Sequence, residues 1–457
     1  MNSKMEKLAA LNAKATAASP ARERLTALFD PDTFVEIDTY VMAGGCGVIA
    51  GYGLVEGSTV YAYAQDVTSD SGAMNVAHAN KIRKIYDLAL KNGCPVVSVY
   101  DSKGAKISEG NAMLAAYGQI LQAANNLSGV VPQIAVVLGT CSGASALLAA
   151  SADFVIASKD GEIFLSAEKC DCCDAGSAAY AAENGLVHIL ADDEAAAVKE
   201  TRKLLSVLPL NNLAAAPLYE YVEPAAAAEG ADAKAVIAAI ADGGSVTEIC
   251  AAYAPAVITA FGTVAGSCVG FVATDKAADA LNSAACEKAA HFIKVCDAFS
   301  IPVVSLIDTD GFKRTACPSM IKAGAKLANV YAEATCAKVN VVTGNAIGAA
   351  YIALAGSNAN ADVTFAWPNA MISALPAETA VEFSMVDRLA GAEDPKAARA
   401  ALEAEYADTT ASAFAAAEGG YITNVIAPAE TRAQVITALD MLSGKRVSKL
   451  PKKHNNL

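Results

Sequence analysis

An internal repeat constrains the fold of this chain more than any other feature of its 457 residues, because a repeated sequence must build the same unit twice. Residues Val48–Asp66 align without a gap to Val257–Asp275, at an offset of 209 (257 − 48). Each segment contains two alternating apolar stretches, separated by a turn at Gly57 or Gly266. This pattern predicts one β-hairpin in each half of the chain.

Two further pairs of segments extend the repeat. Cys94–Asp101 matches Ile301–Asp308 at an offset of 207 (308 − 101), and Gln133–Gly139 matches Lys338–Gly344 at an offset of 205 (344 − 139). All four segments are short apolar runs, and a helical pattern precedes each member of the first pair. Helix, strand and loop in this order are typical of parallel α/β units. The three collinear matches therefore predict two homologous α/β domains.

The boundary between these domains is expected in Ala214–Gly230, which is rich in Ala, Pro and Glu and has no helical or strand period. We therefore predict an N-terminal domain at residues 1–225 and a C-terminal domain at residues 226–457. The first segment, Met1–Ala18, carries several charges and lacks a continuous apolar core. It is expected to form a surface helix and not a signal peptide.

The composition combines a hydrophobic fraction of 54% with only 18% charged residues. This balance fits either a membrane protein or a compact oligomer, and a membrane helix needs about 18 or more consecutive apolar residues. The apolar runs are strand-length, as in Val131–Leu138. We therefore predict a cytoplasmic homo-oligomer. The net charge of −14 argues against nucleic acid as a partner, because phosphate binding demands clustered Lys and Arg.

The 12 cysteines are interpreted as free thiols of a reducing compartment. The only cluster comprises Cys170, Cys172 and Cys173. Zinc sites usually need a second pair of Cys or His at a defined spacing, and none lies nearby. We therefore predict that the chain holds no metal.

The strongest indication of chemistry is a stretch of small residues that follows an equivalent apolar strand in each half. Small side chains at the start of a helix leave backbone N–H groups open to a ligand, and two such amides form an oxyanion hole. Taken alone, such a stretch more often serves close packing, but its recurrence favours a shared function. The candidate donors are the amides of Gly143, Ala144, Gly348, Ala349 and Ala350.

A nucleophilic mechanism is the alternative. Cys141 or Ser142 could attack a carbonyl if a base stood near, but none of the four histidines has a partner that the sequence identifies. The second half carries Ala346 and Ile347 at the equivalent positions, so a triad would exist only once. The residues thus indicate two candidate oxyanion holes and no obvious side-chain base, an arrangement suited to stabilising an enolate.

Ten short segments spread over nearly the whole chain match the motifs of one protein family. They are Ala21–Glu36, Tyr63–Asp66, His78–Ile82, Gly104–Gly110, Ser128–Gln133, Ala289–Ile293, Cys296–Pro302, Gly324–Leu327, Phe365–Pro368 and Pro451–His454. In these segments the sequence resembles the carboxyltransferase subunits of biotin-dependent acyl-CoA carboxylases and decarboxylases, such as the propionyl-CoA carboxylase β and methylmalonyl-CoA decarboxylase α subunits.

The resemblance implies an α/β fold of two crotonase-like ββα-spiral domains and an enzyme that moves a carboxyl group between biotin and a short acyl-CoA, such as propionyl- or acetyl-CoA. It assigns the amides of Gly143 and Ala144 to the thioester oxygen in the first domain. The amides of Gly348, Ala349 and Ala350 are assigned to the ureido oxygen of biotin in the second. The other binding residues that it implies are Gly104, Ala105, Ser142, Ile347, Tyr351 and Ile352.

The resemblance also implies the mechanism and the partners. In the family, carboxybiotin releases carbon dioxide, the biotin enolate takes the α-proton of the acyl-CoA, and no protein base is needed. The chain has no biotinylation motif and no ATP-binding loop. Biotin is therefore expected on a separate carboxyl carrier protein, with a biotin carboxylase or a membrane-embedded decarboxylase subunit as a further partner. The family often assembles as a hexamer, a trimer of dimers.

Several positions depart from the family pattern. Family Gly-Gly steps become Gly143-Ala144 and Gly348-Ala349, and the added methyl groups narrow each site. Ile352 stands where propionyl-CoA carboxylases typically have Asp. Two alternatives therefore stay open: a non-catalytic paralogue that assembles with an active subunit, and a crotonase-fold hydrolase that uses Ser142 or Cys141.

Overall fold

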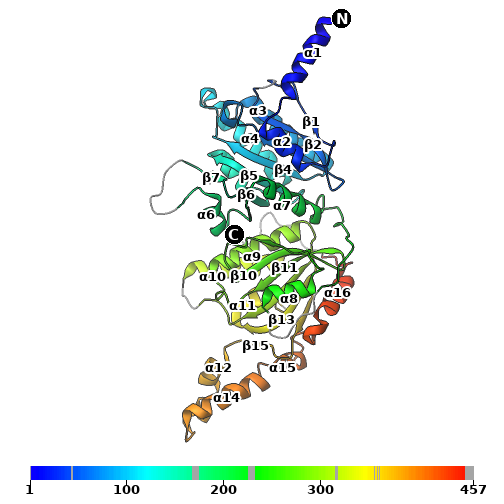
Figure 1. Ribbon diagram of the computed structural model, residues 1–457. Coiled ribbons are helices and arrows are strands. Elements are labelled where there is room, and N and C mark those ends of the chain that lie inside the picture. The colour runs from blue at the N-terminus through cyan, green and yellow to red at the C-terminus, as the bar shows by residue number, and fades with distance from the viewer. Residues whose placement is uncertain are drawn as a thin grey trace. The chain divides into compact units, whose positions relative to one another are not determined.

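The structure is a computed structural model that describes residues 2–42, 45–166, 174–224, 232–313, 317–354, 356–357, 359 and 361–447. The chain divides into two compact units, Met1–Pro217 (unit 1) and Leu218–Leu457 (unit 2), which we treat separately (Figure 1). The boundary expected from the sequence, at residues 225/226, lies at the edge of a segment outside the described residues.

Unit 1 is built on one mixed sheet with the strand order β1-β2-β3-β4-β5-β6-β8, and β7 pairs with the end of β5. The first three strands are antiparallel, and the pairs from β3 onwards are parallel. The strands are β1 (Val35–Glu36), β2 (Val48–Val55), β3 (Ser58–Gln65), β4 (Val96–Ser102), β5 (Gln133–Ser142), β6 (Phe154–Ser158), β7 (Glu162–Phe164) and β8 (Ile189–Ala191).

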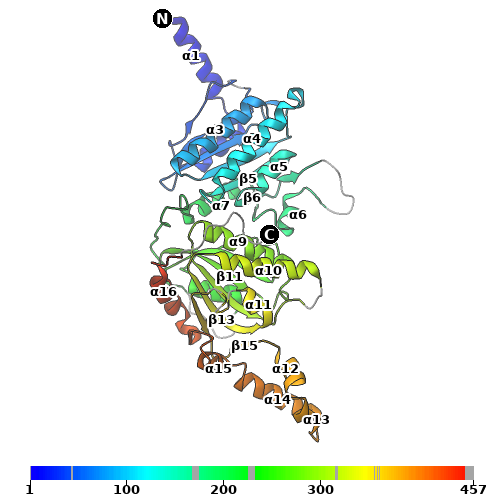
Figure 2. The same cartoon turned by 180° about the vertical axis from the view of Figure 1, so that it is seen from behind.

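Helices cover both faces of this sheet. α3 and α4 lie together on one face, and α2 and α7 lie together on the other (Figure 1, Figure 2). The main core joins apolar side chains of α3 and α4 to the central strands. The helices are α1 (Asn2–Ala15), α2 (Pro20–Leu28), α3 (Val76–Asn92), α4 (Ala112–Leu127), α5 (Ala144–Ala150), α6 (Ala178–Glu183) and α7 (Glu194–Val207), with 3₁₀ turns at η1 (Asp70–Gly72) and η2 (Ile107–Glu109).

Unit 2 repeats this architecture, with the strand order β9-β10-β11-β12-β13-β14-β16 and with β15 beside the end of β13. The predicted hairpins are β2–β3 and β10–β11, and the predicted parallel strands are β4, β5, β12 and β13, so the duplication is confirmed. The strands are β9 (Thr247–Ile249), β10 (Val257–Val264), β11 (Ser267–Thr274), β12 (Val303–Thr309), β13 (Lys338–Ile347), β14 (Val363–Ala366), β15 (Met371–Ser373) and β16 (Asn424–Val425).

The helices of unit 2 include an extension that has no counterpart among the described residues of unit 1. It comprises α12 (Ala377–Ser384), α13 (Val386–Ala390) and α14 (Pro395–Thr409), and the ion pairs Arg388–Glu405 and Arg399–Glu382 join α14 to the two shorter helices. The remaining helices are α8 (Ala233–Ile240), α9 (Ser283–Ala298), α10 (Pro318–Glu333), α11 (Gly348–Ala353), α15 (Ala413–Glu418) and α16 (Thr431–Leu442), with a 3₁₀ turn at η3 (Pro428–Glu430).

A buried carboxylate fixes the hairpin of unit 2. Asp242 follows α8 and accepts the turn amides of Ala265 (3.0 Å) and Gly266 (2.8 Å). It also accepts the Thr263 hydroxyl (2.7 Å) and forms an ion pair with Arg432 of α16 (2.6 Å). Burial alone would raise the pKa of Asp242, but these hydrogen bonds together hold it below its ordinary value.

Unit 1 contains the same arrangement. Asp30 follows α2 and accepts the turn amides of Glu56 (3.2 Å) and Gly57 (3.0 Å), while Arg202 of α7 donates to it (2.7 Å). Arg202 also donates to the carbonyl of Leu28, the last residue of α2. The Asp30 side chain is 22% exposed and that of Asp242 only 3%, so the unit 2 carboxylate depends more strongly on its partners.

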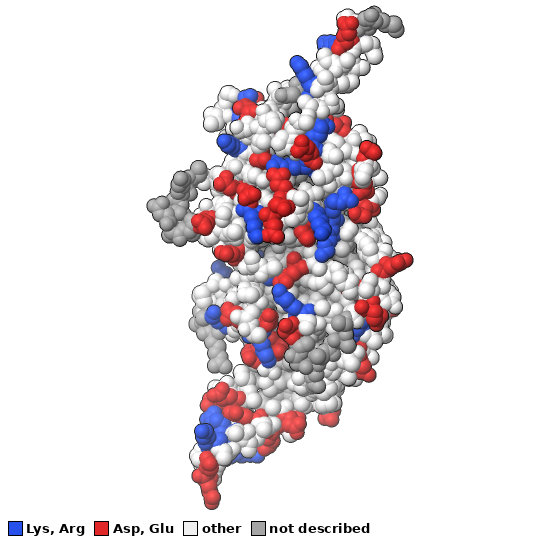
Figure 3. Space-filling model, in the orientation of Figure 1, with Lys and Arg blue, Asp and Glu red and all other residues white. Residues whose placement is uncertain are grey.

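No described helix combines the length and the apolar character needed to span a bilayer. On the face shown in Figure 3, acidic and basic side chains are interspersed, and no extended area is basic alone. The predicted N-terminal surface helix is α1, whose described side chains are largely exposed.

Replacing Asp242 with Asn is expected to destabilise the protein by about 3 kcal/mol, because four donors then lose a buried negative charge. The same change at Asp30 should cost about 1 kcal/mol, since that carboxylate is more exposed. Urea unfolding followed by circular dichroism measures both.

Since the folded pKa of Asp242 is depressed, its contribution to the free energy of unfolding is present above the unfolded pKa of about 3.9 and is lost as the pH falls through the folded pKa. If Asp242→Asn lost stability on acidification as steeply as the unchanged protein does, this contribution of Asp242 would be contradicted.

Candidate active site

The end of strand β4 is shaped by a carboxylate that lies against the neighbouring strand. Asp101 occupies the point where the β4–β5 register shifts, and a Cβ placed on Gly139 would lie 2.2 Å from its Oδ1. Only glycine therefore fits at position 139. Arg24 of α2 balances the charge, with its Nη1 2.7 Å from Asp101. β4 ends one residue later, at Ser102, which pairs with Cys141 of β5.

The loop after β4 leaves the backbone amide of Ala105 without a backbone acceptor. Ser102 Oγ accepts the Gly104 N–H (3.1 Å), and the bridge to Met74 uses the Gly104 carbonyl and the Lys106 N–H (each 2.8 Å). A parallel bridge of this kind uses the groups on either side of Ala105, so the N–H of Ala105 itself points away from Met74.

The junction of β5 and α5 lies beside this loop. A Cβ on Gly104 would lie 3.3 Å from Ser142 Oγ, so the structure brings together these two predicted binding residues of unit 1. Gly143 has φ +62°, and a side chain there would meet nothing within 4 Å, so the adjacent space is open. The Gly143 N–H donates to the Phe164 carbonyl (3.0 Å), whereas Ala144 begins α5 and its N–H has no acceptor within that helix.

Unit 2 repeats the geometry of the strand end and its loop. A Cβ on Gly344 would lie 2.3 Å from Asp308 Oδ1, and Lys276 is 2.8 Å from the same carboxylate. Thr309 Oγ accepts the Gly311 N–H (3.2 Å), as Ser102 does for Gly104. Phe312 forms a parallel β-bridge with Leu281, as Ala105 does with Met74, and the Lys313 N–H donates to the Leu281 carbonyl. Phe312 is therefore the counterpart of Ala105. The sequence matches Gly104 to Gly311, but the roles of Ser102, Thr309 and Phe312 depend on hydrogen bonds that no motif marks.

The predicted donors of unit 2 lie at the start of α11. Gly348, with φ +65°, Ala349 and Ala350 are its first three residues, whose N–H groups have no acceptor within the helix. The side chains of Ile347 and Ala350 are buried in the unit.

Two cavities flank this helix start. The first has a volume of about 590 Å³ and a surface that is mainly apolar, and its lining includes Gly348 and Ala349. The lining residues that carry hydroxyl groups are Tyr351, Ser357, Ser373, Tyr406, Thr410 and Tyr421. The second, of about 410 Å³, lies between α10 and α11 and is lined by apolar side chains that include Phe312 and Ile321. Ile352, whose side chain is 60% exposed, borders both cavities.

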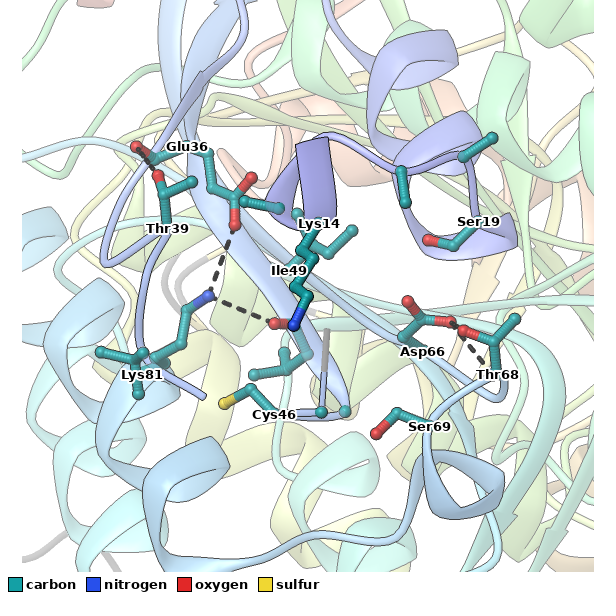
Figure 4. Close-up of a pocket in the computed structure, with 17 residues that line it drawn as sticks. Lys14, Ser19, Glu36, Thr39, Cys46, Ile49, Asp66, Thr68, Ser69 and Lys81 are labelled. Carbon is teal, nitrogen blue, oxygen red and sulfur yellow. Dashed lines mark hydrogen bonds and ion pairs between the residues drawn. The ribbon is translucent and has the colours of Figure 1, made fainter. Parts of the chain in front are cut away.

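A polar cleft of about 140 Å³ lies elsewhere in unit 1, between the end of α1 and the β2–β3 hairpin. Figure 4 shows the amino groups of Lys14 and Lys81 pointing into the same space. Lys81 donates to the Val48 carbonyl (3.2 Å) and lies 3.6 Å from Glu36, and the carboxylate of Asp66 also lines the cleft. None of the predicted site residues lines this cleft.

The nucleophile alternative finds little support in this geometry. Cys141 is fully buried, and burial raises the pKa of its thiol to about 12. Ser142 Oγ donates weakly to the Ser102 carbonyl (3.5 Å) and has no hydrogen bond to a base among the described residues. Burial lowers the pKa of His78 to about 3, and both of its ring nitrogens are buried without a partner.

Within the described ranges, no three His, Cys, Asp or Glu side chains come together as a metal site would require. The cysteine cluster, Cys170, Cys172 and Cys173, lies outside these ranges, as does the tail Pro451–His454.

Residues 15–457 match the model of one protein family, the carboxyl transferase domain. The chain belongs to this family. A propionyl-CoA carboxylase β chain of Saccharopolyspora erythraea is 36% identical over 96% of this carboxyltransferase chain and 90% of its own length. The methylmalonyl-CoA decarboxylase α subunit of Veillonella parvula is also 36% identical, over 96% of this chain and 92% of its own length.

A solved structure agrees with these relatives. The carboxyltransferase superposes on transcarboxylase 12S with a TM-score of 0.93 and 33% identity, covering 100% of this chain and 98% of the other. That structure is of a hexamer with methylmalonyl-coenzyme A bound. The agreement confirms the predicted fold of two crotonase-like domains.

The surroundings of the cysteines predict which thiol of the described residues reacts. Cys317 is the exposed one, and hydrogen bonding with Ser319 lowers its pKa. Iodoacetamide at pH 8 should therefore alkylate Cys317 at least about 100-fold faster than Cys141, as peptide mass spectrometry measures. Unfolding in urea should remove the difference. Comparable labelling of both in the folded protein would instead favour Cys141 as a nucleophile.

Proposed function

We propose that the carboxyltransferase moves a carboxyl group between biotin, held on a separate carrier protein, and a short-chain acyl-CoA. One observation carries the proposal: backbone amides without an acceptor in their own helix occur at equivalent strand ends in both units, and Ser142 has no hydrogen bond to a base among the described residues. Such amides stabilise a developing oxyanion but do not transfer protons. Family membership and the named relatives support the same chemistry.

The site of unit 1 is assigned to the acyl-CoA. The amides of Ala105 and Ala144 are its free donors, and they suit a thioester oxygen that becomes an enolate oxygen. The use of the Gly143 amide would require release of its bond to the Phe164 carbonyl. Gly104 and Ser142 keep the two segments in contact through their close approach.

The site of unit 2 is assigned to biotin. The N–H groups at the start of α11 fit a ureido oxygen, and the adjoining cavity of about 590 Å³ is mainly apolar, as a bicyclic thioether ring requires. Gly348, Ala349 and Ala350 would hold the ureido oxygen, with Ile347, Tyr351 and Ile352 around it. When bound, biotin carries the carboxyl group and accepts the α-proton of the acyl-CoA, so the protein needs to supply only positioning and charge stabilisation.

Partners follow from the same assignment. A biotin carboxyl carrier protein must reach unit 2, and either a biotin carboxylase or a membrane decarboxylase subunit must exchange carboxyl groups with that carrier. Exposed apolar side chains at equivalent positions, Leu114 and Leu147 in unit 1 and Ile321 and Ile352 in unit 2, support assembly of identical chains. We propose a cytoplasmic hexamer, as a trimer of dimers.

The purified chain is expected to decarboxylate methylmalonyl-CoA or malonyl-CoA only when free biotin is added. Release of carbon dioxide from isotopically labelled substrates measures the reaction and ranks the two acyl chains. Biotin-independent release would contradict the role of unit 2. A folded oligomer with no release from either substrate would favour the non-catalytic paralogue, which the methyl groups of Ala144 and Ala349 also motivate.

Ala144→Pro is expected to lower kcat by at least about 100-fold, because proline removes the free amide. Ala144 is the first residue of α5, where proline fits the helix, so the fold should survive. Ala233→Pro makes the same change at the first residue of α8, away from the proposed site, and should retain activity. Full activity in folded Ala144→Pro would show that the amide is not used.

A further inference from the structure

One difference between the two units lies in the short strand that pairs with the end of β5 or β13. The last residue of β5, Ser142, pairs with Phe164 of β7, and the last residue of β13, Ile347, pairs with Ser373 of β15. An apolar ring in unit 1 is thus replaced by a hydroxyl in unit 2. Ser373 lines the large cavity beside Gly348 and Ala349.

The helical extension brings a second hydroxyl to the same wall. Tyr406 lies near the end of α14, and its hydroxyl is 2.7 Å from Ser373 Oγ. The backbone holds the tyrosine in place, because the Thr410 and Ala411 amides both donate to its carbonyl (each 3.0 Å), and Ala411 in turn accepts the Ile372 N–H (2.8 Å). The extension therefore contributes directly to the lining of the cavity.

The hydroxyl pair has an unused donor. Each hydroxyl carries one hydrogen, and the bond between the two oxygens uses only one of them. The Leu375 N–H donates to Ser373 Oγ (3.4 Å), so this further contact consumes a lone pair and not a hydrogen. One O–H group of the pair is left without an acceptor inside the pair, in a cavity whose walls are mainly apolar.

We propose that Ser373 and Tyr406 form a second polar binding group of unit 2, whose free O–H donates to the cyclic urea of biotin or to the carboxyl group attached to it. The proposal rests on the assignment of biotin to this cavity. Ser373 and Tyr406 line the same cavity as Gly348 and Ala349, so the hydroxyl pair and the amides at the start of α11 can reach one ligand. Both groups are donors, and the ligand's oxygens are acceptors.

The test compares the binding of free biotin with the kinetics. Tyr406→Phe is expected to raise the Kd for biotin, measured by equilibrium dialysis, by about tenfold, within the range of one lost hydrogen bond in an apolar site. The KM for biotin should rise similarly, whereas the KM for methylmalonyl-CoA should stay within about twofold. Ser373→Ala should behave alike, and the double variant should be no worse than the worse single variant. Ser373→Thr keeps the hydroxyl and should restore most of the binding.

Tyr331→Phe provides the matched control, because it breaks a Tyr–Ser hydroxyl pair (Tyr331–Ser305, 2.8 Å) in the core of the same unit and lines neither cavity. Its thermal midpoint should fall, with biotin binding unchanged. Two outcomes would overturn the role of Ser373 and Tyr406 but leave the proposed function intact. One is an equal effect of Tyr406→Phe and Tyr331→Phe on biotin binding. The other is a parallel change in the KM values for biotin and for methylmalonyl-CoA. A wild-type protein that neither binds nor uses biotin would overturn both.

Discussion

The close approach of a carboxylate to a glycine in the next strand is the constraint on which both sites depend. Asp101 lies over Gly139 and Asp308 lies over Gly344, at distances that leave no room for a Cβ. At each of these points the register of the parallel strands shifts, and one further pair of residues, Ser102–Cys141 or Thr309–Ala346, aligns before the shorter strand ends. The carboxylate therefore marks the point where the two strands change register, one residue before β4 and β12 end.

The sequence predicts the features that are local or repeated. The hairpins, the parallel strands and the small-residue steps at Gly143 and Gly348 all follow from periodicity and alignment of the two halves. It does not predict that the Gly143 amide is already bound to Phe164, because that bond joins segments whose pairing no pattern specifies. Nor does it indicate that Tyr406 reaches the cavity, since the extension that carries it has no counterpart in the first half.

Duplication followed by local divergence explains how one fold serves two ligands. The backbone donors are kept in both units because they depend on strand ends and small residues. The side chains beside these donors differ. Phe164 of unit 1 corresponds to Ser373 of unit 2, and Ala105 of unit 1 corresponds to Phe312 of unit 2. In the proposed function, the shared amides stabilise negative charge on an oxygen, and the side chains that differ distinguish the two ligands.

The hairpin carboxylates also join the beginning of each unit to its end. Asp30 and Asp242 follow the helices that open each fold, and Arg202 and Arg432 belong to helices that close it. Each repeat is thus fastened by contacts contained within itself. The carboxylate, the hairpin turn and the arginine all belong to one unit, so this connection between its start and its end needs no structural element from the other unit.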